Sequence, residues 1–163
     1  MNAPETFTKS DPNAPDGFFE AEARGLRWLA QADGGVPVVA VRHVDHRQIV
    51  LDRLEAISPS RAQAVQLGRR LASTHATGCS VWGRDDGDGY IGPLPLPNGP
   101  YPSFADLWWS GRIEPYLRRA ADGGLLSLAD AEAVERAVVV HGPQASVPAP
   151  SRVHGDLWSG NVV

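Results

Sequence analysis

The sequence has little of what several common protein classes require. Its 163 residues include one cysteine, Cys79, which excludes an internal disulfide, and no Cys/His cluster has zinc-site spacing. No apolar run approaches the roughly 18 residues that a membrane-spanning helix needs. The first residues carry no basic flank followed by an apolar stretch, so no secretory signal is expected. We therefore expect a soluble, cytoplasmic domain.

An excess of basic residues is also lacking. Fifteen Lys and Arg stand against nineteen Asp and Glu, which gives a net charge of −4. A general binder of nucleic acid or of anionic membranes needs a basic stripe, so neither partner is expected. The apolar share of 42% and the charged share of 21% are typical of globular domains, and they are sufficient for a packed core.

Glycine and proline are abundant, at 17 and 14, and eleven of them lie between Gly78 and Pro102. A loop this long inside a domain is generally either functional or disordered. Aromatic and aliphatic side chains are interleaved with these residues, for example Trp82, Tyr90 and Tyr101. Disordered linkers are poor in such side chains, so the composition predicts an ordered loop.

The first third of the chain predicts a helix and a hairpin. Apolar residues recur at helical spacing over residues 17–31, and Asp16 is the expected N-cap. Residues 36–44 and 48–54 are rich in Val, Ile and Leu and predict an antiparallel hairpin in which Ile49-Val50-Leu51 is buried.

The rest of the chain is mainly helical in pattern. A capping box opens a helix at Ser60, with His75 on its apolar face as an expected core histidine. Residues 103–121 predict a helix kinked at Pro115, and Ser127 begins another that runs to about residue 140. Trp108 and Trp109 stand at helical positions and are expected to pack in the core. The order of elements predicts an α+β fold, a small β layer followed by a helical layer.

The most informative segment is His154-Gly155-Asp156-Leu157-Trp158-Ser159-Gly160-Asn161. It contains H-x-D-x-x-x-x-N, the arrangement of kinase catalytic loops. In that arrangement the Asp carboxylate accepts the proton of the attacking hydroxyl, while the Asn oxygen faces a Mg²⁺ on the nucleotide. The simpler interpretation makes Asp156 a turn residue that caps its own backbone.

The whole string resembles the catalytic loop of the fructosamine kinase (ketosamine kinase) family, relatives of the aminoglycoside phosphotransferases. Aminoglycoside and choline kinases generally lack Leu-Trp-Ser-Gly at this place. Further segments are similar to the family from about residue 5 onward. They are Phe7-Thr8-Lys9, Phe19-Glu20-Ala21-Glu22-Ala23, Ile49-Val50-Leu51-Asp52 and Asp88-Gly89-Tyr90-Ile91-Gly92.

The resemblance implies a protein-kinase-like fold with a partial nucleotide-binding small β lobe over residues 1–54. A partial helical large lobe over residues 55–163 would then end at the catalytic loop. The implied activity is ATP- and Mg²⁺-dependent phosphorylation of a sugar hydroxyl on a ketoamine or glycated amine. An aminoglycoside- or choline-type phosphotransferase is the nearest alternative, because no residue here proves a sugar substrate.

The resemblance also implies a role for particular residues. Asp156 would be the catalytic base, Asn161 the metal ligand and Trp158 a residue lining the substrate pocket. Lys9 would contact the nucleotide phosphates and Glu22 would hold it by an ion pair. The interlobe hinge that pairs with adenine would be Asp52, Arg53 and Leu54. Without the resemblance, Lys9 and Glu22 would be interpreted as solvated surface charges.

Two parts of such a kinase have no counterpart in the sequence. One is an Asp after the catalytic loop that serves as second metal ligand, and the other is a glycine-rich strand–turn–strand before Lys9. We therefore expect residues 1–163 alone to have no measurable kinase activity. A non-catalytic remnant that acts as a binding or interaction module is the rival hypothesis. A His/Asp metal hydrolase is disfavoured, because the histidines lack ligand-pair spacing.

Overall fold

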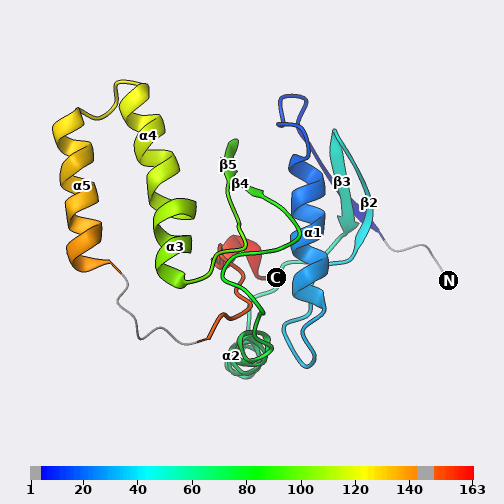
Figure 1. Ribbon diagram of the computed structural model, residues 1–163. Coiled ribbons are helices and arrows are strands. Elements are labelled where there is room, and N and C mark those ends of the chain that lie inside the picture. Colours follow the sequence, from blue (N-terminus) through cyan, green and yellow to red (C-terminus); the bar gives the residue numbers. More distant parts are fainter. Residues whose placement is uncertain (1–4, 143–148) are drawn as a thin grey trace. The chain divides into compact units, whose positions relative to one another are not determined.

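The computed structural model describes residues 5–142 and 149–163, arranged in two compact units. The first unit contains the chain up to Cys79 together with Ser151–Val163, and the second is Ser80–Pro150. Both strands and helices are present, as the α+β prediction requires (Figure 1). The predicted lobe boundary after residue 54 stays a prediction. Residues 1–4, where no secretory signal is predicted, lie outside the described part.

A three-stranded antiparallel sheet in the order β1–β3–β2 forms one side of the first unit (Figure 1). Its strands are β1 (Thr6–Ser10), β2 (Val41–Asp45) and β3 (Gln48–Asp52). The predicted hairpin is therefore confirmed for β2 and β3, although residues 36–40 are not part of a strand. The pairing shifts register between Val41 and His43, so Arg42 occupies a β-bulge. Lys9 lies opposite Ile49 in the β1–β3 pairing.

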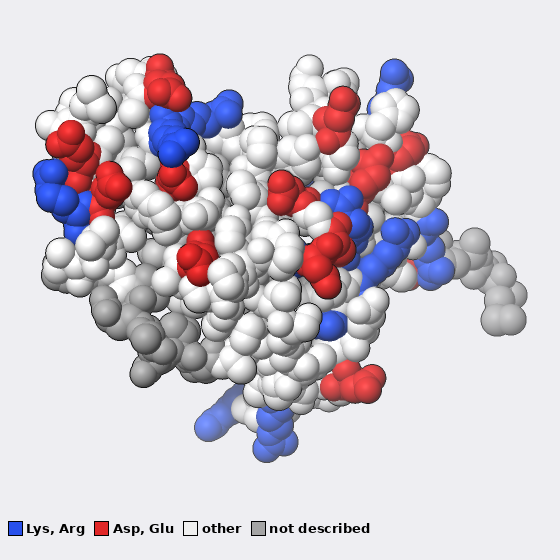
Figure 2. All heavy atoms as spheres, viewed as in Figure 1, with Lys and Arg blue, Asp and Glu red and all other residues white. Residues whose placement is uncertain are grey.

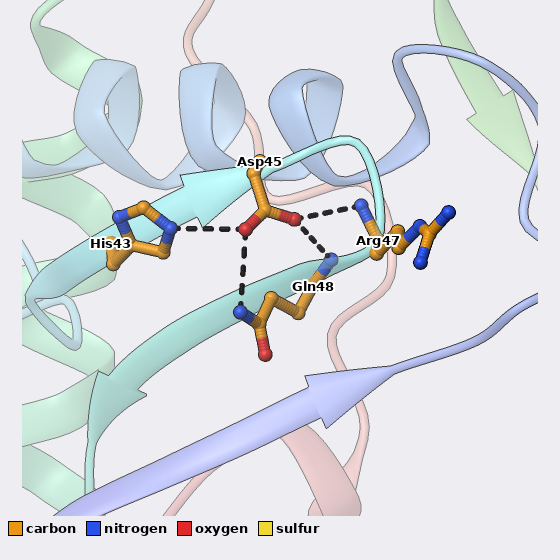
Figure 3. A network of polar contacts seen from close by, with 4 residues as sticks. All are labelled: His43, Asp45, Arg47 and Gln48. Carbon is orange, nitrogen blue, oxygen red and sulfur yellow. Dashed lines mark hydrogen bonds and ion pairs between the residues drawn. The ribbon is translucent and has the colours of Figure 1, made fainter.

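The turn between β2 and β3 is organised by Asp45 (Figure 3). One oxygen of its carboxylate accepts hydrogen bonds from the backbone N–H of Arg47 at 2.8 Å and of Gln48 at 3.1 Å. The other oxygen lies 3.0 Å from Nε2 of His43. The hydrogen bond from Arg47, followed by that from His43, lowers the pKa of Asp45 from 3.8 to about 2. The carboxylate thus fixes the turn in its ionised form.

Helix α1 (Phe18–Ala30) packs against the sheet and forms the core of the first unit with it. Phe19, Ala23 and Ile49 are completely buried, whereas Val50 and Leu51 are only partly buried. The prediction of Asp16 as N-cap is wrong. Gly17 takes that position with φ of 82°, a conformation that favours glycine, and no side chain caps the helix.

Helix α2 (Arg61–Ala76) begins at the predicted capping box, in which Ser60 and Gln63 exchange hydrogen bonds. Its buried residue is Thr74, whose Oγ1 accepts a hydrogen bond of 3.0 Å from the backbone N–H of Val36. His75 is exposed, so its assignment as a core histidine is wrong. The helix is anchored by a polar contact, which hydrophobic periodicity does not detect.

In the second unit the long Gly/Pro-rich loop is ordered, as predicted. It contains an unpredicted hairpin of β4 (Gly89–Ile91) and β5 (Leu94–Leu96). A bridge between Trp82 and Tyr101 closes the base of the loop. Arg112 donates hydrogen bonds to the Pro97 carbonyl at 2.6 Å and to Oδ1 of Asn98 at 2.9 Å. The loop is therefore held to the helical segment that follows it by polar contacts from Arg112.

Helical residues 104–122 divide into α3 (Phe104–Trp108), a π-helical turn (Trp109–Ile113) and α4 (Glu114–Asp122). The kink predicted at Pro115 stays a prediction, and what the structure has there is a π-helical turn that ends two residues before the proline. Pro115 consequently falls in the first turn of α4, where its missing N–H costs nothing. Helix α5 (Leu128–His141) comes next in the chain and begins at a capping box formed by Ser127 and Asp130.

Trp108 and Trp109 line a groove together with Val138 and Val139 of α5. Trp108 is 39% exposed, so its prediction as a core residue is wrong. On the face shown in Figure 2, acidic and basic side chains are interspersed on each unit, in agreement with the small net charge. Within the described ranges no helix is both long and apolar enough to span a bilayer.

Candidate functional site

Lys9 and Glu22, which the sequence predicts as an ion pair, are brought together by β1 and α1. Nζ of Lys9 donates to Oε2 of Glu22 over 2.8 Å. Because Lys9 belongs to β1, this contact shows that the Glu22 carboxylate faces the neighbouring strand. The lysine side chain is 48% exposed and that of Glu22 28% exposed. A half-exposed ammonium held by a carboxylate is well placed to meet an anion from solvent.

The second predicted cluster lies in the turn that follows Val153. Gly155 has φ of 84°, in the left-handed region that a side chain would strain. The backbone N–H of Asp156 donates to Nδ1 of His154 at 3.3 Å. A short 3₁₀ turn, Ser159–Asn161, then returns the chain toward Asp156.

This turn brings Asp156 and Asn161 into direct contact, although they are five residues apart. Nδ2 of Asn161 donates to the backbone oxygen of Asp156 at 2.8 Å and to its Oδ2 at 3.0 Å. Because the amide nitrogen points at Asp156, the amide oxygen of Asn161 points away from it. The pair therefore presents a carboxylate and an amide oxygen together, both ligands that hard cations prefer.

The acidic residues near this turn do not make a metal site by themselves. Among the described residues, no group of three or more His, Cys, Asp or Glu could hold a metal ion. Mg²⁺ is commonly held by one or two protein ligands plus substrate phosphates. The donor set of Asp156 and Asn161 suits such a shared ion.

Trp158 and Gly160 are related by close contact within the same turn. A Cβ at position 160 would lie 2.4 Å from Cη2 of the Trp158 indole, closer than atoms can approach. Glycine at this position thus lets the indole lie across the turn, while the Trp158 side chain stays 60% exposed. The sequence singles out Trp158, but it gives no sign of this role for Gly160.

The three predicted hinge residues follow one another at the end of β3. Arg42 donates two hydrogen bonds to the Asp52 carboxylate, one of them 2.8 Å long. Hydrogen bonding from Arg42 lowers the pKa of Asp52. The backbone N–H of Asp52 donates to Ala40, and that of Arg53 donates to Glu5 at 2.9 Å. Leu54 lies past the strand and is 52% exposed.

Sequence reasoning missed Arg152, which is 9% exposed and lies just before the turn of residues 154–161. Its guanidinium carbon is 4.5 Å from the ring centroid of Trp28, and its Nη1 donates to the backbone oxygen of Trp28. Trp28 belongs to the last turn of α1, 124 residues earlier in the chain. In the sequence, the only sign of this contact is a charged residue placed two positions before the His154 motif.

Comparison with known proteins gives consistent results. The sequence model described as fructosamine kinase matches residues 2–163. A "Probable ketoamine kinase" of Thermus thermophilus is 34% identical over 95% of this chain, and one of Enterococcus faecium is 29% identical over 96%. A crystal structure of a candidate fructosamine-3-kinase from Thermobifida fusca superposes with a TM-score of 0.84, at 40% identity over 97% of this chain.

These relatives are considerably longer than the chain. It spans 53% of the Thermus thermophilus protein and 56% of both the Enterococcus faecium and the Thermobifida fusca proteins. The fold matches the N-terminal part of the fructosamine-3-kinase structures.

Proposed function

The chain belongs to the fructosamine kinase family, and from this premise we propose that it forms the phosphate-clamping and catalytic-loop part of a ketoamine kinase. The whole protein would transfer the γ-phosphoryl group of ATP to a sugar hydroxyl of a glycated amine, with Mg²⁺, in the cytoplasm. The observation that carries this proposal is the contact of Asn161 with Asp156, whose carboxylate lies 3.0 Å from the amide nitrogen.

In this proposal Asp156 accepts the proton of the attacking hydroxyl, since it is the exposed carboxylate of the turn. Asn161 has two tasks: its Nδ2 orients the Asp156 carboxylate, and its oxygen would hold Mg²⁺. When bound, ATP would supply the phosphoryl group and Mg²⁺ would neutralise the charge that develops on it. Gly155, with its positive φ, permits the turn that brings Asp156 and Asn161 together.

Lys9 would neutralise the nucleotide phosphates, and Glu22 would hold the ammonium in place. The distance of 2.8 Å between their charged groups supports this assignment. A lysine that is only half exposed loses little mobility when it binds an anion, because Glu22 already orients it.

The remaining predicted contacts are assigned by position. The amides of Asp52 and Arg53 are already bonded within the first unit, so Leu54 is the hinge residue proposed to meet the adenine edge. Trp158, two residues after Asp156, exposes 60% of its surface, and an aromatic ring there suits the apolar face of a sugar. An aminoglycoside or choline-like alcohol is the alternative substrate class.

A second candidate function is a non-catalytic binding module. It is supported by the exposure of all five residues of β1, including Lys9, among the described residues. A binding module would need Asp156 only as a turn residue, whereas a kinase needs its carboxylate.

The experiment that separates the two is phosphoryl transfer by the protein purified from its own cells. ATP, Mg²⁺ and a glycated lysine derivative are mixed with the protein, and the sugar product is followed by ³¹P NMR. A phosphorylated ketoamine supports the kinase. Mg²⁺-independent ligand binding with no transfer supports the binding module.

A further inference from the structure

Arg152 is the most deeply buried basic side chain in the described part of the chain, and it has no carboxylate partner there. It contacts Trp28 in two ways, through the ring face and through the backbone oxygen. Its Nε is buried without a hydrogen-bond partner among the described residues. Burial of a charge without a counter-charge is costly, so the contact with Trp28 must provide compensation.

The end of α1 provides that compensation. The last carbonyls of a helix have no partner inside the helix and carry the negative end of its dipole. Arg152 donates to the carbonyl of Trp28, which also accepts a hydrogen bond of 3.3 Å from the backbone N–H of Gln31, and its guanidinium carbon lies over the Trp28 indole. Arginine suits both contacts because its planar group stacks and donates at the same time, which lysine does not.

The same helix carries Glu22, six residues before Trp28, or about 9 Å along the axis. Arg152 lies four residues before Asp156 in the chain. One rigid helix therefore contacts the ammonium of Lys9 near one end and the entry to the catalytic turn near the other.

We propose that Arg152 is a positioning residue that ties the catalytic turn to α1 and so fixes Asp156 and Asn161 relative to the Lys9–Glu22 pair. Its importance for activity rests on the proposed kinase function, whereas the tie itself does not. Phosphoryl transfer depends on alignment of the nucleotide with the base, and a misplacement of about 1 Å can cost about a hundredfold in rate. Loss of Arg152 should release the turn while the helix and sheet keep their structure.

The tie is tested on the 163-residue chain by paramagnetic broadening in NMR spectra. Cys79 is replaced by Ser, and a nitroxide is attached at Ala30→Cys, an exposed position at the end of α1. The label should broaden the amide signals of residues 153–156. The amides of β3, which packs against α1, serve as the internal reference for an intact fold.

Arg152→Met is expected to reduce this broadening several-fold, with the β3 signals unchanged. Arg152→Lys should give an intermediate result, and Trp28→Leu should resemble Arg152→Met. Arg118→Met, which removes an exposed arginine from an i,i+4 pair, is the matched control and should change nothing. If Arg152→Met does not fold, the broadening measured in Arg152→Lys and Trp28→Leu tests the proposal instead. Unchanged broadening in the folded variants would overturn the proposal.

A kinetic measurement separates the tie from the kinase function. In the protein purified from its own cells, Arg152→Met should lower kcat about a hundredfold. The KM for ATP should change little, because the Lys9–Glu22 pair is intact. An unchanged kcat would overturn the positioning role. A tie shown by NMR, with no kinase activity in any variant including the unmodified protein, would refute the kinase function and leave the tie standing.

Discussion

Asn161 holds Asp156 through two hydrogen bonds from one amide nitrogen, 2.8 Å to the backbone oxygen and 3.0 Å to the carboxylate. This arrangement fixes the carboxylate and turns the amide oxygen of Asn161 away from it. In the proposed function, one asparagine thereby orients the base and presents a ligand for Mg²⁺. The contact closes within the turn, so it requires no other part of the chain.

Removal of the Asn161 amide should weaken binding of Mg²⁺·ATP. In the protein from its own cells, Asn161→Ala is expected to lower the affinity by about 10- to 100-fold, the range found when groups that support a metal are lost. Isothermal titration calorimetry at fixed Mg²⁺ measures the effect. Asn13→Ala replaces an exposed loop asparagine and is the control. Equal affinities of Asn161→Ala and the unmodified protein would exclude Asn161 as a metal ligand.

Glu22→Gln should affect nucleotide binding far more than stability. The pair with Lys9 is partly exposed, so its loss should change the free energy of unfolding by less than about 1 kcal/mol. An unanchored Lys9 should lower ATP affinity about tenfold, or about 1.4 kcal/mol. Urea unfolding and nucleotide titration give the two quantities. Glu132→Gln removes a comparable partner of Arg136 on α5 and should leave ATP affinity unchanged. If the pair were purely structural, Glu22→Gln would lower the free energy of unfolding and leave the ATP affinity unchanged.

Gly160→Ala should move the Trp158 indole, because the new methyl group would lie 2.4 Å from the ring. We expect a shift in the tryptophan fluorescence spectrum and a loss of affinity for the ketoamine substrate. The backbone of the fold should be unaffected, since the exposed ring can rotate away. Gly68→Ala is the matched control: nothing lies within 4 Å of its Cβ, and in helix α2 it should stabilise the protein by about 0.5–1 kcal/mol. Identical spectra for Gly160→Ala and the unmodified protein would show that the ring does not rest on Gly160.

Asp45 should make stability depend on pH at the acidic end. Its pKa is lowered from 3.8 to about 2 in the folded chain, so the unfolded state binds the proton more readily. The stabilisation is therefore fully present above pH 3.8 and is lost as the pH falls through about 2. Asp45→Asn should lower the thermal midpoint at pH 6 and have little effect at pH 2. Thermal unfolding followed by circular dichroism checks this, and an equal effect at both pH values would be inconsistent with the ionised turn.

Local features of the fold could be predicted from the sequence, and contacts between distant segments could not. The capping box at Ser60 depends on residues three apart, and the structure has it as expected. The cap expected at Asp16 failed because Gly17 adopts a positive φ, a choice that the local pattern does not reveal. The buried residue of helix α2 is Thr74, whose hydroxyl accepts a hydrogen bond from Val36, and an apolar periodicity does not reveal such a contact.

The candidate site shows the same division. The motif at residues 154–161 was visible because its members are close in sequence, and the ion pair of Lys9 with Glu22 followed from the resemblance to a family. The contact of Arg152 with Trp28 joins segments 124 residues apart. It depends on where the helix ends relative to the turn, and no periodicity or spacing in the sequence carries that information.

The most direct test is phosphoryl transfer by the protein from its own cells, with Asp156→Asn as the matched variant. Incubation with ATP, Mg²⁺ and a glycated lysine should give a phosphorylated sugar, and Asp156→Asn should lower kcat by at least about a hundredfold, because general-base catalysis contributes about 10²–10⁴-fold. Transfer that survives Asp156→Asn undiminished, or no transfer at all, would contradict the assignment of this turn as the catalytic loop of a ketoamine kinase.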